Sequence, residues 1–167
     1  MIPTIRRFLA VVSIFGLAAS IVAYIASYFG STMDSLWRWA LLLHPGVFIL
    51  VLPMFALEYS SIKNRVFFWT AFKQGRPTWT VQAITLTALF FLFHFVIFLI
   101  ESHAASPEIK DGDYVLNNHG HIVKVLTHAE YLALKGAELR LFATGWIFFY
   151  LVVTMYWWFP RIRQLVL

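Results

Sequence analysis

Apolar residues gather in four long stretches along the chain, separated by polar segments. The stretches run from Phe8 to Phe29, Leu36 to Leu57, Thr80 to Ile100 and Leu141 to Phe159. Each is close to the roughly 20 residues that a helix needs to cross the hydrocarbon core of a bilayer. The pattern therefore predicts an all-α membrane protein, a bundle of four transmembrane helices within a single domain, residues 1–167.

Two polar segments add detail to this bundle. Residues 59–79 mix aromatic and basic side chains, a composition typical of a helix that lies in the headgroup layer. In the segment 101–140, Thr127 stands three residues before Glu130, which is the spacing of a helix-capping box. We expect a helix to begin there and to continue without a break into the fourth stretch.

A β-hairpin is predicted just before this helix. Residues 113–126 alternate apolar and polar positions on both sides of a turn that contains Asn and Gly. A hairpin is marginal alone and needs a surface that covers its apolar face. We expect Val115, Ile122 and Leu126 to pack on the start of the fourth helix. Alternatively, these side chains pack on a partner protein.

The charges predict the orientation of the helices. The chain has 13 basic and 8 acidic residues, and the basic ones cluster beside the predicted inner ends of the apolar stretches. This cluster consists of Arg6, Arg7, Lys63, Arg65, Lys73, Arg76, Arg161 and Arg163. Because Lys and Arg of short loops stay in the cytoplasm, both termini are predicted to be cytoplasmic, in a bacterial inner membrane. Anionic lipid headgroups of the bilayer, and not nucleic acid, are the expected partners of this charge.

The first stretch carries a continuous stripe of small residues. The stripe consists of Ser13, Gly16, Ser20, Ala23, Ser27 and Gly30. In lipid, small residues let helix backbones approach closely and so favour packing. We expect a tight contact within the chain; a contact between two copies, giving a homo-oligomer, stays open.

Polar residues form a column on the third and fourth stretches. The column consists of Thr80, Thr87, His94 and Glu101 on the third, with Arg140 and Thr144 on the fourth. Polar groups in hydrocarbon are costly, so this column should face the interior of the bundle. Glu101 and Arg140 both fall at the outer boundary, where they form either an ion pair or two separately solvated charges.

Histidines are the candidate ligands for a cofactor or a metal. His44 and His94 fall at nearly equal depth on antiparallel stretches, as a bis-histidine haem b or a metal site requires. The alternatives are an interhelical hydrogen bond from each histidine, or a proton relay. In the outer segment, His119 and His121 share a strand face and, with His128, are candidates for copper or zinc.

The remaining chemistry of the chain does not favour an enzyme. There is no cysteine, which excludes disulfides, iron–sulfur clusters and thiol nucleophiles. Glu58 and Glu101 lie at opposite edges of the predicted bilayer, so they cannot act as a catalytic pair, and no catalytic residue is identified.

Two functional hypotheses follow. The first is a small non-enzymatic membrane protein that binds another membrane or extracytoplasmic protein, as an accessory subunit or an immunity-type factor, with no cofactor. The alternative is a redox or metal protein that binds haem b or a metal through His44 and His94.

Overall fold

The computed structural model describes residues 3–29, 33–62, 73 and 76–159. The described part of the chain is mostly helical, with one small sheet. Its helices are α1 (Pro3–Ala26), α2 (Met33–Ala40), α3 (Leu43–Ile62), α5 (Thr78–Ser102) and α6 (His128–Trp158). Its strands are β1 (Ser106–Lys110), β2 (Asp113–Asn118) and β3 (His121–Val125). Most of the predicted headgroup helix, residues 63–72 and 74–75, and Gly30 of the small-residue stripe lie outside the described residues.

Four helical segments are long and apolar enough to cross a membrane, which confirms the prediction of four such helices. They are Thr4–Ala26, Trp37–Tyr59, Thr78–Ser102 and His128–Trp158. The second is composite, because α2 ends in a turn at residues 41–42 before α3 begins. Pro45 lies in the first turn of α3, where its missing N–H needs no partner within the helix. The predicted continuous stretch from Leu36 to Leu57 is therefore interrupted close to its outer end.

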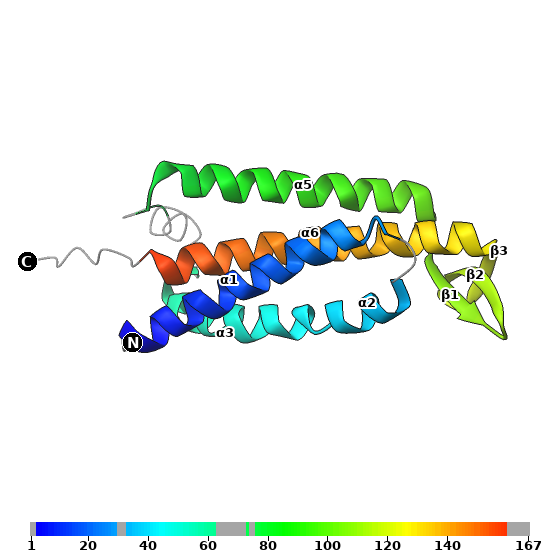
Figure 1. The fold of residues 1–167 in the computed structure, drawn as a ribbon. Coiled ribbons are helices and arrows are strands. Elements are labelled where there is room, and N and C mark those ends of the chain that lie inside the picture. The colour runs from blue at the N-terminus through cyan, green and yellow to red at the C-terminus, as the bar shows by residue number, and fades with distance from the viewer. Residues whose placement is uncertain (1–2, 30–32, 63–72, 74–75, 160–167) are drawn as a thin grey trace, which may run out of the picture.

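Helix α6 is the centre of the molecule. It runs along the middle of Figure 1, where α1 crosses it, α5 lies on one side and α3 on the other. Its contact with α1 is the most extensive between any two described helices. Residues of α6 such as Ala143, Trp146, Tyr150 and Val153 are almost completely buried and form the middle of the apolar core. The other long helices thus acquire their positions mainly through α6.

Residues 106–125 form a three-stranded antiparallel sheet in the order β1-β2-β3. The predicted hairpin is present, but the sheet has one strand more than predicted. Residues 113–118 and 121–125 pair as expected, but β1 adds a strand on the far side of β2. The turn between β1 and β2 uses Asp111 and Gly112 with φ of 54° and 92°, the backbone that tight hairpin turns require. Pro107 in β1 is tolerated because this strand lies at an edge of the sheet.

The sheet packs against the beginning of α6. Leu116 and Leu126 are buried with Ala105 and Tyr131, and the Tyr114 ring lies 4.8 Å from the Tyr131 ring. Val115 is also buried. Ile122 differs from the expectation, because 51% of its surface is exposed.

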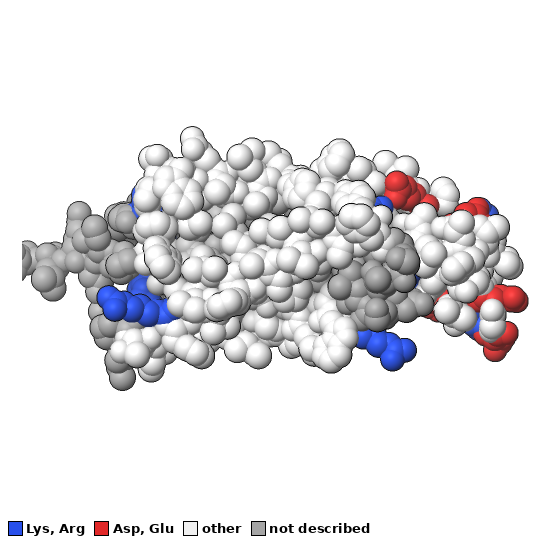
Figure 2. All heavy atoms as spheres, in the orientation of Figure 1, with Lys and Arg blue, Asp and Glu red and all other residues white. Residues whose placement is uncertain are grey.

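Charge separates along the molecule. The face drawn in Figure 2 carries almost no charged side chains over the length of the helices, while acidic side chains gather at the end that holds the sheet. Helix α1 begins and α6 ends at the opposite end of the molecule. This distribution suits a chain whose uncharged middle lies in hydrocarbon.

Candidate functional site

The free edge of strand β3 carries exposed apolar side chains. Within the described sheet, β3 pairs with β2 on one side only. All five of its residues are exposed, and Ile122, Val123 and Val125 show 51%, 53% and 64% of their surface. An edge strand presents unpaired backbone N–H and C=O groups, which can pair with a strand of another protein. The edge of β3 is therefore a candidate binding site for an extended segment of another protein.

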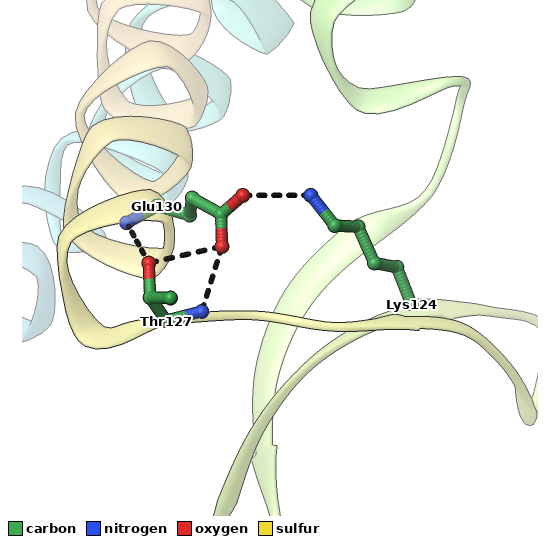
Figure 3. A network of polar contacts seen from close by, with 3 residues as sticks. All are labelled: Lys124, Thr127 and Glu130. Carbon is green, nitrogen blue, oxygen red and sulfur yellow. Dashed lines mark hydrogen bonds and ion pairs between the residues drawn. The ribbon is translucent and has the colours of Figure 1, made fainter.

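A polar network fixes β3 to the start of α6 (Figure 3). Thr127 caps the helix: its hydroxyl accepts from the Glu130 amide at 3.2 Å, and the Glu130 carboxylate accepts from the Thr127 amide at 2.7 Å. The predicted capping box is confirmed. Lys124 of β3 lies 2.7 Å from the other oxygen of the same carboxylate. This contact joins the edge strand to the helix.

The same network sets the charge state of Glu130. The hydrogen bond from Lys124, followed by those from Thr127, lowers the pKa of the Glu130 carboxyl to about 2. The carboxylate therefore stays ionised at neutral pH and is matched by the Lys124 charge. A lysine on an edge strand normally discourages pairing with other strands. Here Lys124 is paired with Glu130. The other exposed side chains at this edge are mainly the apolar ones of β3.

His119, His121 and His128 do not form one metal-binding group with other described residues. His119 is exposed in the turn before β3 with φ of 50°, and His121 is exposed at the start of β3. His128 lies against Tyr114, with 5.0 Å between ring centroids. Among the residues that the structure describes, no three His, Cys, Asp or Glu side chains form a group that could hold a metal. The copper or zinc site stays a prediction from the sequence.

His94 of α5 makes contacts with α1. Its Nε2 lies 3.2 Å from the Tyr24 hydroxyl, and its Nδ1 lies 3.0 Å from the Phe90 carbonyl oxygen. Both ring nitrogens are thus engaged. A role as an axial haem ligand would require His94 to give up the contact with Tyr24.

His44 of α3 makes contacts with α6 instead. Its Nδ1 accepts a hydrogen bond from the Trp146 indole at 3.2 Å, and its ring also lies against Phe48 and Phe142. The two histidines therefore take part in separate sets of contacts, one on α6 and one on α1. Each histidine thus makes the interhelical hydrogen bond that was one alternative from the sequence. The sequence pattern did not identify Tyr24 and Trp146 as the partners.

The polar column is partly buried. Thr80, His94 and Thr144 are buried, whereas Glu101 is exposed. Thr87 is half-buried and donates to carbonyls of its own helix, as Thr144 does to Leu141. The column thus approaches the interior over most of its length but not at its outer end.

The ion pair between Glu101 and Arg140 is not formed. Arg140 donates to the Ser27 carbonyl at 3.4 Å, and its guanidinium lies 4.8 Å from the centre of the Tyr28 ring. The two salt bridges among the described residues are Lys124–Glu130 and Lys135–Glu138. Arg140 is thus directed to the end of α1, where carbonyls without helical partners accept hydrogen bonds.

The small-residue stripe of α1 lies against α6. Ser13, Ser20, Ala23 and Ser27 are almost completely buried. Each serine hydroxyl donates to a carbonyl of its own helix, so no polar hydrogen is left unpaired. A Cβ on Gly16 would lie 2.1 Å from a ring carbon of Tyr150. The stripe therefore lets α1 and α6 approach so closely that the Tyr150 ring of α6 lies directly on Gly16 of α1.

The sequence interpretation missed a cluster at the C-terminal end of α6. Arg6 donates to the carbonyls of Tyr156, Trp157 and Phe159 at 2.6–2.8 Å. The Tyr156 hydroxyl donates to Glu58 at 2.9 Å, and Arg76 lies over the Tyr156 ring. The last carbonyls of a helix lack helical partners and carry partial negative charge, so an arginine there is favourable. In the sequence, Arg6 indicates only the orientation of the first helix.

The chain matches no known family model, and no curated protein or solved structure was found to be similar to it.

Proposed function

We propose that this chain is a non-enzymatic integral membrane protein that binds another protein through the free edge of β3. The accessible edge, with three exposed apolar side chains and a lysine already paired to Glu130, carries this proposal. The partner contributes an extended segment that continues the sheet, so backbone hydrogen bonds supply affinity and side chains supply selectivity. An accessory subunit of a larger complex or an immunity-type factor would use such an edge to bind its partner.

The membrane placement is part of the same proposal. Four helices of suitable length and the uncharged middle of the molecule support insertion in a bilayer. Arg6, Arg7 and Arg76 lie close to the helix ends opposite the sheet, and the sequence beside these ends adds further basic residues. This excess supports cytoplasmic termini and an outward-facing sheet in a bacterial inner membrane. The β3 edge would then face the extracytoplasmic side, where an outer domain of a partner can reach it.

The orientation can be tested separately with single cysteines, because the native chain has none. In Asn118→Cys, the thiol should react with a membrane-impermeant maleimide added outside the membrane. Cysteine placed at the exposed Arg7 should react only after the membrane is permeabilised. Labelling of Asn118→Cys only from the cytoplasm would contradict the orientation.

Charge substitutions on β3 test the protein-binding proposal. The variant Ile122→Lys/Val123→Lys/Val125→Lys keeps the strand exposed but replaces its apolar surface with charge. The matched control is Ala129→Lys/Ala133→Lys, at exposed positions in the first turns of α6. A partner that co-purifies stoichiometrically with the wild type should be lost from the β3 variant and kept by the control. Equal recovery with both variants would overturn the proposal.

The redox alternative is tested by the visible spectrum of the purified protein. A Soret band that disappears in His44→Ala and in His94→Ala would favour haem b over the protein-binding proposal.

A further inference from the structure

Two polar side chains in the last turns of α6 are buried without a hydrogen-bond partner. Thr154 shows 7% of its surface and Trp157 shows 1%. Oγ1 of Thr154 and Nε1 of Trp157 are closed off from the surface, and neither makes a hydrogen bond within the described chain. An unpaired polar group in an apolar core is costly, so a molecule that bonds to both atoms would be favourable.

The Thr154 hydroxyl differs from the other buried serine and threonine hydroxyls of the described residues. Each of those donates to a carbonyl oxygen three or four residues earlier in the chain. They belong to Ser13, Ser20, Ser27, Thr80, Ser102 and Thr144. Such a bond satisfies the hydroxyl close to its own position in the chain. The Thr154 hydroxyl makes no bond of this kind in the described structure, so it is available to a group beside the helix.

Thr154 and Trp157 lie on the same face of α6. Residues three apart on a helix are neighbours, with about 5–6 Å between their Cβ atoms. Long side chains of a helix point back toward its N-terminus, over the preceding turn. The Trp157 ring is therefore directed toward the turn that carries Thr154. The two polar atoms do not bond to each other, so a small molecule between them can satisfy both.

The chemistry of the two atoms identifies the molecule that fits. An indole N–H only donates, whereas a hydroxyl both accepts and donates. The ligand must therefore accept from Trp157 and form a second hydrogen bond with Thr154. Because both atoms are closed off from the surface, a lipid headgroup or a larger cofactor cannot reach them. Water meets these conditions, since buried waters bond to two to four polar groups that lack other partners.

The two side chains lie close to a polar end of the bundle. Arg6 donates to the Trp157 carbonyl at 2.8 Å, and Nε of Arg76 lies 3.5 Å from the Met155 carbonyl oxygen. Both contacts are at the end of the molecule opposite the sheet, where α1 begins and α6 ends (Figure 1). A water molecule that enters from this end passes only the last turn of α6 and not the length of the apolar core.

We propose that one water molecule is bound between Thr154 and Trp157. Its oxygen accepts from Nε1 of Trp157, and one of its hydrogens is donated to Oγ1 of Thr154. The water thus connects two successive turns of α6 at the place where Arg6 binds the last carbonyls of the same helix. This inference goes beyond the proposed function and depends neither on a partner at β3 nor on the orientation in the membrane.

X-ray radiolysis of the full-length protein in nanodiscs tests the proposal, because hydroxyl radicals formed from a bound water oxidise the side chains beside it. Tandem mass spectrometry assigns the oxidised residue. Trp146 of the same helix is the matched control, because it shows 2% of its surface and its indole already donates to His44. We expect Trp157 to be oxidised several-fold faster than Trp146. Equal rates for these two tryptophans would overturn the proposal, and this comparison in the wild type does not depend on the folding of any variant.

Substitutions at Thr154 test the second bond of the water. Thr154→Val removes the hydroxyl, so the oxidation rate of Trp157 should fall to that of Trp146. Thr154→Ser restores a hydroxyl and should restore most of the oxidation. The control Thr144→Val removes a buried hydroxyl that is bonded to the Leu141 carbonyl and should leave the oxidation of Trp157 unchanged. Unchanged oxidation of Trp157 in Thr154→Val would show that radicals reach it through opening of the helix end, which would contradict a bound water.

Discussion

The Tyr150 hydroxyl of α6 donates a hydrogen bond to the Leu43 carbonyl at the start of α3, with 3.0 Å between the oxygens. The same ring lies on Gly16 of α1, and the hydroxyl lies on Gly46 of α3. A Cβ on Gly16 would collide with the ring, and a Cβ on Gly46 would collide with the hydroxyl oxygen. One side chain thus connects three helices. Its position explains why glycine is needed at two places that are far apart in the sequence.

The first prediction concerns Gly16. In Gly16→Ala the new methyl would lie 2.1 Å from Cε1 of Tyr150, so the ring or the helix must move. We expect a loss of stability of about 1–3 kcal/mol, the usual cost of overpacking. Thermal unfolding in detergent micelles measures it. Ala19→Val adds bulk on the exposed face of the same helix and should leave the transition nearly unchanged; an equal effect of the two substitutions would contradict the packing.

The second prediction is a reversal at Gly46. Its added Cβ would lie 2.3 Å from the Tyr150 hydroxyl oxygen but 3.6 Å from the ring carbon that carries it. Gly46→Ala should therefore destabilise the wild type but be neutral or stabilising when Tyr150→Phe has removed the oxygen. Tyr150→Phe alone should cost about 0.5–1.5 kcal/mol through the lost bond to Leu43. Additive effects in the double-mutant cycle would show that the two residues do not contact each other.

The third prediction concerns the C-terminal end of α6. Arg6→Ala removes donors to three terminal carbonyls and should cost about 1.5–3 kcal/mol, the range for hydrogen bonds that involve a charge. Arg6→Lys keeps the charge but not the forked geometry, so its effect should be intermediate. Arg7 is exposed, and Arg7→Ala serves as the control. Equal unfolding temperatures for Arg6→Ala and Arg7→Ala would contradict the contact.

The fourth prediction is a dependence of stability on pH. The folded pKa of Glu130, about 2, lies below its ordinary value of 4.5. The folded state therefore binds this proton more weakly than the unfolded state. Its contribution to stability is complete above about pH 4.5 and is lost as the pH falls toward about 2. Hydrogen exchange of the β3 amides between pH 6 and pH 3, corrected for intrinsic exchange, measures the effect.

Two substitutions control for other carboxylates. Glu130→Gln should be less protected at pH 6 and should lose this part of the pH dependence. Glu101→Gln changes an exposed carboxylate on α5 and should behave as the wild type. A parallel decrease of protection in the wild type and in Glu130→Gln would show that the network of Lys124 and Thr127 does not hold the charge.

The long helices could be predicted from the sequence because length and apolar content are enough to identify a segment that can cross a bilayer. The capping box at Thr127 and Glu130 could be predicted because it depends on residues close in sequence. Strand β1 was missed, although the Asp111-Gly112 turn is a hairpin signal. Its residues 106–110 include a proline and alternate only weakly, so pairing with β2 determines the strand.

The contacts between helices could not be predicted in the same way. Spacing along one helix places Arg140 and Glu101 on defined faces but does not fix the rotation of one helix relative to the next. Arg140 is bound at the end of α1, and Glu101 is exposed. Likewise, the equal depth of His44 and His94 in the sequence pattern does not identify their hydrogen-bond partners. The partner of His44 is Trp146, and that of His94 is Tyr24. These contacts depend on how all the helices pack on α6.

The central claim, that β3 is a protein-binding edge, is tested most directly by photo-crosslinking in intact cells. A photoreactive amino acid is placed at Val125, and the matched position is Ala133, which is exposed on α6 and lies outside the strand. We predict a discrete adduct with one other protein from Val125, which is absent from Ala133 and abolished by Ile122→Lys/Val123→Lys. The absence of a protein adduct at Val125, or the same adducts at both positions, would contradict the claim.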